Sequence, residues 1–133
     1  MELPRDEIAF RKEYEGLVLD RTIRTVFRPG NRIYPSWRGY RPGEIVTARI
    51  IDRCGSDELA IPPLFNDHRV RVRIAALRYL HIDELTDEDF DGSSPDIFDV
   101  ASLEEHLLYI YRRPIEAFGR MVTRIGLDYP DED

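Results

Sequence analysis

The sequence predicts an α+β domain with a mostly antiparallel sheet and flanking helices. Its 133 residues match the size of one compact domain. Segments rich in β-branched residues, typical of strands, are interspersed with segments whose apolar residues recur at helical spacing. We find no internal repeat and no linker. One domain is therefore expected over residues 1–133, with residues 128–133 forming an acidic, frayed tail.

Three segments are expected to be helical. Asp6 can cap a helix over residues 7–18, where several apolar side chains recur near helical spacing. Thr86 begins a short helix. Ser102 and Glu105 form a capping box at the start of a longer helix that continues as an apolar stripe.

Four segments are expected to be strands, namely residues 21–27, 45–51, 70–74 and 122–125. In the third, apolar residues alternate with arginines at a period of two, which predicts a half-buried strand. That strand can continue, with a bulge or bend, through Leu77, Tyr79 and His81. The Pro- and Gly-containing residues 33–41 are expected to form a loop. The size of the chain permits closure of the sheet into a partial barrel.

The net charge of -7 conceals a basic segment. Between residues 21 and 53 the acidic residues are Glu44 and Asp52, whereas the arginines are Arg21, Arg24, Arg28, Arg32, Arg38, Arg41, Arg49 and Arg53. Aromatic residues lie between these arginines, namely Phe27, Tyr34, Trp37 and Tyr40. Guanidinium groups match phosphate oxygens and aromatic rings stack on bases, so this composition suits anionic ligands that carry rings.

A block of acidic residues extends over residues 83–105, which contain no lysine or arginine. Clustered carboxylates can hold hard cations, but residues 87–92 lack the ligand spacing of a calcium loop. A solvated helix–loop–helix with acids in its first turns is the favoured interpretation. His68, His81 and His106 are too scattered for a metal-ligand pattern. We expect neither a metal site nor a cofactor.

The sequence also predicts a cytoplasmic protein. No apolar run approaches the roughly 20 residues that cross a bilayer. The N-terminal residues lack the basic-then-apolar order of a signal peptide. Cys54 is the single cysteine, so an intrachain disulfide is excluded.

Residues 17–28, 42–46 and 79–90 carry local motifs in an order that resembles that of ASCH domains. Residues 17–28 resemble the opening of these domains, where a helix leads to a Lys-Thr-x-Thr-x-Arg-like strand. Residues 42–46 resemble their Gly-Asp/Glu turn into a strand, and residues 79–90 resemble a strand that runs into an "eLteeDf" helix. Gly92, a further helix and a last strand at residues 122–125 follow. The chain thus resembles the ASCH family of the PUA-like superfamily.

This resemblance implies a small PUA-like β-pseudobarrel that grips RNA or nucleotides beside the first motif. Some members are hydrolases that remove the acetyl group from N4-acetylcytidine with a Lys and a Thr of that motif and a later Glu. Others are described as ribonucleases or coactivator-type modules.

The first motif of this chain departs from the hydrolase pattern. The Lys is replaced by Arg21 or Arg24, and arginine stays protonated and cannot readily act as a nucleophile or base. The second Thr of the motif falls on Thr25, Val26 or Phe27, depending on the alignment. The later acid would fall within residues 90–96, which offer Asp91 and Asp96 but no Glu.

We therefore expect an RNA- or nucleotide-binding module that uses an arginine and aromatic cleft. The candidate ligand-binding residues are Arg21, Arg24, Thr25, Arg28, Trp37, Tyr40 and Arg41. One alternative is a small hydrolase acting on a modified nucleoside or on RNA, with Thr25, Asp91 and Asp96 as its polar machinery. A second alternative is a protein-interaction domain, in which the basic and acidic faces meet a partner or a second copy.

Overall fold

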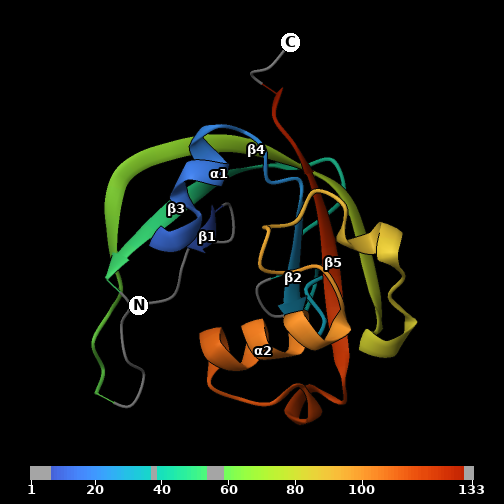
Figure 1. Cartoon of the computed structure of the whole chain (residues 1–133). Coiled ribbons are helices and arrows are strands. Elements are labelled where there is room, and N and C mark those ends of the chain that lie inside the picture. Colours follow the sequence, from blue (N-terminus) through green and yellow to red (C-terminus); the bar gives the residue numbers. More distant parts are fainter. Residues whose placement is uncertain (1–6, 37–38, 54–58, 131–133) are drawn as a thin grey trace.

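In the computed structural model, five strands form one mixed sheet in the order β1-β3-β4-β5-β2 (Figure 1). The structure describes residues 7–36, 39–53 and 59–130, so the candidate residue Trp37 and the single Cys54 lie outside the described part. The strands are β1 (Glu7–Arg11), β2 (Thr25–Pro29), β3 (Ile45–Arg53), β4 (Leu64–His81) and β5 (Met121–Asp128). The chain is therefore a small α+β protein.

All but one of the strand pairings are antiparallel, as the sequence predicts. The exception is β1, which pairs parallel to β3. In the part of the chain that the structure describes, the sheet is open, with β1 at one edge and β2 at the other. Strand pairing thus does not close it into a barrel, although β4 arches over the other strands (Figure 1).

The helices are short and lie beside the sheet. The elements with α-helical hydrogen bonding are α1 (Glu15–Leu19) and α2 (Val100–Tyr111). Single 3-10 turns are η1 (Lys12–Tyr14), η2 (Ile82–Glu84), η3 (Asp87–Phe90) and η4 (Ile115–Phe118). Within residues 7–36, 39–53 and 59–130, no helix is long and apolar enough to cross a membrane.

The helix expected over residues 7–18 is wrong in its first half, which forms β1. Ile8 and Phe10 alternate with more exposed neighbours and enter the core, as on a half-buried strand. The apolar residues of this segment also recur at helical spacing, so both periods were present. Parallel pairing with β3, in which Ile8 is the partner of Ala48, decides in favour of the strand.

The first predicted strand begins later than residues 21–27 suggest. Arg21 adopts a left-handed conformation with a φ of 58°, which interrupts an extended chain. The backbone N–H groups of Arg24 and Thr25 both donate to the carbonyl oxygen of Gly92, at 2.7 and 3.0 Å. The residues before Thr25 therefore form a turn, and β2 starts at Thr25.

The other three strand predictions are confirmed, because residues 45–51, 70–74 and 122–125 lie within β3, β4 and β5. The expected bulge in β4 is also present, as a register shift between Ile74 and Ala76.

Helix α2 has a different cap from the one expected. Asp99 is the N-cap, and its Oδ1 accepts a hydrogen bond from the backbone N–H of Ser102 at 2.7 Å. The hydroxyl of Ser102 in turn contacts the backbone N–H of Asp99 at 3.0 Å. Ser102 is thus the N3 partner of a capping box rather than its first member. At Thr86 the predicted start is correct, because η3 follows directly.

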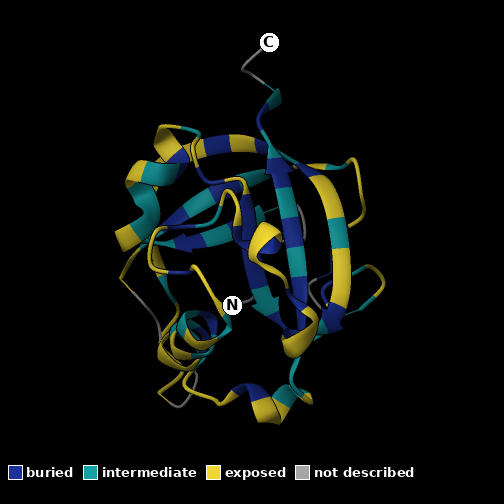
Figure 2. Ribbon diagram, turned by 45° about the vertical axis from the view of Figure 1, so that its right-hand side comes forward, coloured by how far each residue is buried: buried dark blue, intermediate teal, exposed yellow. Residues whose placement is uncertain are grey.

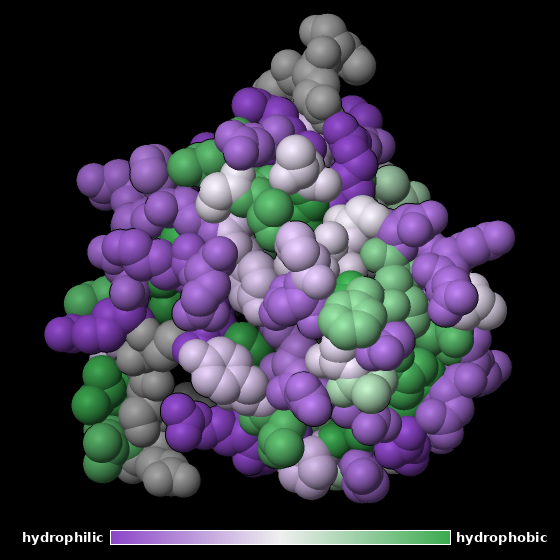
Figure 3. All heavy atoms as spheres, in the orientation of Figure 1, coloured by the Kyte–Doolittle hydropathy of each residue, from purple (hydrophilic) through white to green (hydrophobic). Residues whose placement is uncertain are grey.

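Two clusters of buried side chains form the core, and β2 contributes to both. Val26 belongs to the cluster that packs with β1, β3 and β4, whereas Phe27 belongs to the cluster beneath α2 with Leu103 and Leu107. Buried residues lie mainly on the strands, whereas exposed residues lie on the turns, on the helix surfaces and along much of β4 (Figure 2). The face in Figure 3 is largely hydrophilic, with apolar residues visible between polar ones.

The expected frayed tail is wrong for Asp128 and Tyr129. Asp128 ends β5, and Tyr129 is buried, with its hydroxyl donating to the carbonyl oxygen of Ile23 at 2.6 Å. This bond ties the C-terminal segment to the turn before β2.

Replacing Tyr129 with Phe is expected to lower the free energy of unfolding by about 1–2 kcal/mol, because the Ile23 carbonyl loses its hydroxyl donor in a buried site. Urea denaturation measures this. Tyr79→Phe is the matched control, since Tyr79 is exposed on β4. Equal effects of the two variants would contradict a role for the Tyr129 hydroxyl.

Candidate functional site

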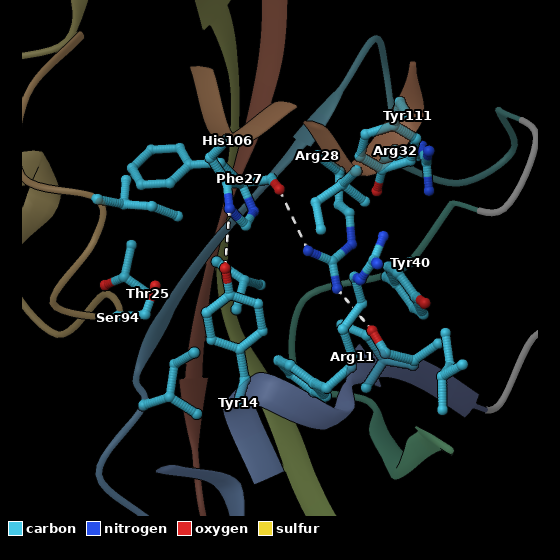
Figure 4. Close-up of a pocket in the computed structure, with 18 residues that line it drawn as sticks. Arg11, Tyr14, Thr25, Phe27, Arg28, Arg32, Tyr40, Ser94, His106 and Tyr111 are labelled. Atoms are coloured by element: carbon cyan, nitrogen blue, oxygen red, sulfur yellow. Dashed lines mark hydrogen bonds between the residues drawn. The ribbon is translucent and has the colours of Figure 1, made fainter. Parts of the chain in front are cut away.

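A cavity of about 190 Å³ lies between the two edge strands of the sheet, β1 and β2. Its walls come from β1, η1, β2, β3 and α2, and from the segments before β2, between β2 and β3, and before α2. Eighteen residues line it, and the polar or aromatic ones are Phe10, Arg11, Tyr14, Thr25, Phe27, Arg28, Arg32, Tyr40, Ser94, His106 and Tyr111 (Figure 4).

Arg28 bridges the two sheet edges at this cavity. Its Nη2 donates to the carbonyl oxygen of Ala9 on β1 at 2.9 Å, and its Nη1 donates to the Phe27 carbonyl at 3.2 Å. The guanidinium lies 5.6 Å from the centre of the Phe10 ring. A side chain thus joins strands that do not pair, and the space beside it remains hollow.

One half of the cavity is cationic and aromatic. Arg11, Arg28 and Arg32 gather there with Tyr40 and Tyr111 (Figure 4). Among the described residues that line the cavity there is no Asp or Glu. An anion that enters this half therefore meets cations without a competing carboxylate in the wall, in a partly enclosed space where charge attraction is stronger than in water.

Arg32, which is buried, and Arg11, which is partly buried, contribute positive charge to this half. The Arg11 Nε is buried and has no hydrogen-bond partner in the described part of the chain, and the Glu13 carboxylate is 3.6 Å away. Arg32 is only 9% exposed. Beside them, burial raises the pKa of Tyr40 although Arg28 opposes the shift, and the Tyr40 hydroxyl donates to the Glu7 carbonyl at 3.0 Å. Tyr40 therefore stays neutral and offers its ring.

The other half of the cavity is polar and neutral. The Tyr14 hydroxyl donates to Oδ2 of Asp96 at 2.8 Å and lies 3.0 Å from Nδ1 of His106. Burial raises the pKa of Tyr14 and lowers that of His106, where the Asp96 charge opposes the shift. At neutral pH Tyr14 is therefore protonated and His106 is uncharged. Ser94, which is 3% exposed, completes this wall.

Thr25 lies at this neutral half with its hydroxyl fully engaged. Its Oγ1 donates to the backbone carbonyl of Asp91 at 2.5 Å and accepts from Nη2 of Arg124 at 3.2 Å. The single hydroxyl proton is thus committed to a carbonyl oxygen, and no histidine or carboxylate is bonded to this hydroxyl among the described residues.

The cavity includes three of the predicted ligand-binding residues, namely Thr25, Arg28 and Tyr40. It does not include Arg21, Arg24 or Arg41. The first two belong to the turn before β2, where the Arg24 guanidinium lies 5.3 Å from the Tyr129 ring centre. Arg41 lies over the Tyr34 ring at 3.9 Å.

The two candidate acids occupy different positions. Asp91 contacts Thr25 through its backbone carbonyl. Asp96 binds Tyr14 at the edge of the cavity. Partial burial opposes the charged form of Asp96, but hydrogen bonds from Ser94 and Tyr14 outweigh it and lower the pKa of this carboxyl.

Sequence reasoning missed several residues of the cavity: Arg11, Tyr14, Arg32, Ser94 and His106. Helical periodicity could have placed His106, because it is three residues after Leu103 and one before Leu107, both buried on α2. The alternation of Ile8 and Phe10 could have indicated β1. Nothing local indicates that Tyr14 and His106 meet.

Comparisons with known proteins leave the family of the chain open. No family model and no curated protein matches it. One solved structure, titled "Crystal structure of hypothetical protein PH0355", is similar with a TM-score of 0.53 and 16% identity. The match covers 92% of this chain and 96% of that one. At this identity the likeness shows the fold alone, and the fold it shows is a small α+β domain of the same extent.

Proposed function

We propose that the protein binds a nucleotide, free or within single-stranded RNA, in the cavity between β1 and β2. The observation that carries the proposal is the composition of the wall, in which three arginines and several aromatic rings face a hollow without an acidic lining residue in the described part. Guanidinium groups suit phosphate oxygens and rings suit the faces of bases.

The size of the cavity favours a single nucleotide unit. At about 190 Å³ it is smaller than the roughly 300–1,000 Å³ typical of pockets for drug-sized ligands. The net charge of -7 opposes tight binding of long polyanions. A mononucleotide, or one unstacked base of a single strand, reconciles both properties.

The proposal includes a PUA-like pseudobarrel in which β1 and β2 are the edges on either side of the ligand. The hydrogen bond from Arg28 to the Ala9 carbonyl supports this arrangement, because the bond holds the two edge strands close although they do not pair. In this arrangement the ligand would lie between the two unpaired edges, beside Arg28.

The hydrogen bond made by the Thr25 hydroxyl favours binding over the hydrolase alternative. A nucleophilic hydroxyl needs a base that can take its proton, and here the proton is donated to the Asp91 carbonyl. Incubation with acylated nucleosides and with RNA tests the alternative directly, since turnover would establish an enzyme. Self-association that is lost together with the arginines would favour the protein-interaction alternative.

Calorimetric titration with mononucleotides and the corresponding nucleosides tests the proposal. The nucleotides should bind more tightly. Arg28→Gln should weaken nucleotide affinity by about tenfold or more, because a charge-assisted hydrogen bond contributes about 1.5–3 kcal/mol.

Arg71→Gln is the matched control. It removes the same charge from an exposed position on β4, outside the cavity lining. We expect it to leave affinity nearly unchanged. Absence of saturable binding, or an equal loss in both variants, would overturn the proposal.

A further inference from the structure

The contact of Tyr14 with Asp96 and His106 determines where its proton lies. A phenol has one proton, and two acceptor-capable groups face it, Oδ2 of Asp96 at 2.8 Å and Nδ1 of His106 at 3.0 Å. The Asp96 carboxylate is ionised near neutral pH, because its pKa is lowered, and can only accept. The Tyr14 proton therefore points to Asp96.

This assignment fixes the tautomer of His106. With the Tyr14 proton on the Asp96 side, the Tyr14 oxygen presents a lone pair to Nδ1, so Nδ1 must carry the imidazole proton to complete the bond. Among the described residues, both polar contacts of His106 are made through Nδ1. A neutral ring protonated there leaves Nε2 as the acceptor nitrogen of a side chain that lines the cavity.

We propose that Nε2 of His106 reads the base of the bound nucleotide by accepting a hydrogen bond from an amino group, so that amino-bearing bases are preferred over their keto counterparts. This inference rests on the proposed function. In this arrangement the arginines of the cationic half bind the phosphate, and His106 in the neutral half contacts the edge of the base (Figure 4). A carbonyl oxygen in the same place would face a lone pair and gain no bond.

The groups around His106 keep it neutral. Burial disfavours the imidazolium, as do the charges of Arg28 on β2 and Arg11 on β1. Asp96, from the loop before α2, opposes them, and Tyr14 from η1 is uncharged. The pKa of His106 therefore lies below the ordinary value of about 6.5. As pH falls through that pKa, Nε2 becomes a donor and the preference for amino bases is lost.

Two nearly isosteric ligand pairs test the selectivity, CMP against UMP and AMP against IMP. In each pair a carbonyl oxygen replaces an amino group. For the wild-type protein at neutral pH we expect about tenfold tighter binding of the amino member, the effect of about 1.4 kcal/mol from a buried bond made or missed. The preference should shrink as pH is lowered from about 8 toward 5.

Two variants assign the preference to the histidine and its tyrosine. His106→Phe removes the acceptor and should reduce the preference to about one while binding of the phosphate persists. Tyr14→Phe removes the hydroxyl that fixes the tautomer of His106. It should therefore weaken the preference for amino-bearing bases and shift the pH profile of that preference. Tyr79→Phe, an exposed change on β4, should do neither.

Nitrogen NMR of the ligand-free wild-type protein tests the tautomer without any variant. We expect a proton on Nδ1 and an unprotonated Nε2 at neutral pH. A proton on Nε2, or equal affinities within both ligand pairs, would overturn the inference while leaving nucleotide binding intact. Failure of all four nucleotides to bind would overturn the proposed function itself, and this inference with it.

Discussion

Replacing Asp89 with Asn is expected to lower the free energy of unfolding by about 2–3 kcal/mol, because a buried carboxylate with several partners is neutralised. Asp89 is 7% exposed. Its Oδ1 accepts from Arg78 at 2.6 Å, and its Oδ2 accepts from the backbone N–H of Thr86 at 2.9 Å. Arg124, mostly buried, lies 3.7 Å away and would lose its opposing charge. Arg78 is half-exposed, which holds the loss below that of a fully buried pair.

The loss should depend on pH in a defined direction. Burial opposes the charge of Asp89, but hydrogen bonds from Thr86 and Arg78 outweigh it and lower the pKa in the folded state. A depressed folded pKa gives stability that is present above the unfolded value of about 3.9 and is lost as pH falls through the folded value. The difference between wild type and Asp89→Asn should therefore be full near neutral pH and shrink below about pH 4.

Urea denaturation over a range of pH measures both effects. Asp87→Asn is the matched control, since Asp87 is exposed in the same 3-10 turn and should cost little. A loss at Asp89 that did not change below pH 4 would contradict a role for its charge.

Asp89 also supports the cavity wall through its backbone. Its carbonyl oxygen accepts from Nε of Arg124 at 2.8 Å, and Arg124 in turn donates to the Thr25 hydroxyl. The segment from Asp89 to Ser94 is thus attached to β2 and β5 at once. Its acidic composition predicts a solvated surface, but one of its acids, Asp89, is buried and holds the segment in place.

The strands that the sequence predicts are those with a single strong period. The β-branched run of β3 and the alternation of β4 leave no competing helical pattern, and both are confirmed. In β1, five residues carry only Ile8 and Phe10 as buried apolar positions, and helical spacing fits the same stretch. Tertiary pairing decides such a segment, and a local pattern cannot supply that information.

The candidate site was also only partly predictable, because some of its residues come together through tertiary structure alone. Its cationic half could be predicted in part, because Arg28 and Tyr40 belong to one segment that is rich in arginine and aromatic residues. Its neutral half depends on Tyr14 and His106, which are 92 residues apart and meet through the fold alone. Arg21 and Arg24 belong to the same basic segment as Arg28, but they lie in the turn before β2 and do not line the cavity, whereas Ile23 between them does.

Replacing Gly92 with Ala is expected to cost about 2–3 kcal/mol of stability, because two penalties act at once. Its φ of +84° is strained for any residue with a Cβ. A Cβ there would lie 3.1 Å from the Arg24 Cβ and 3.2 Å from the Thr25 Oγ1. The carbonyl of Gly92 also accepts the N–H groups of both residues, so the contact cannot open without loosening the start of β2.

Gly43→Ala separates the two penalties. Gly43 has a φ of +87°, and a Cβ there would have no atom within 4 Å. This variant should cost only the conformational strain, about 1–2 kcal/mol, and should leave nucleotide affinity unchanged. Gly92→Ala should lose more stability and also some affinity, because crowding against Thr25 displaces the cavity wall that Thr25 and Ser94 form. Denaturation and nucleotide titration of both variants measure these effects, and identical results at the two glycines would show that the close approach at Gly92 contributes neither to stability nor to the site.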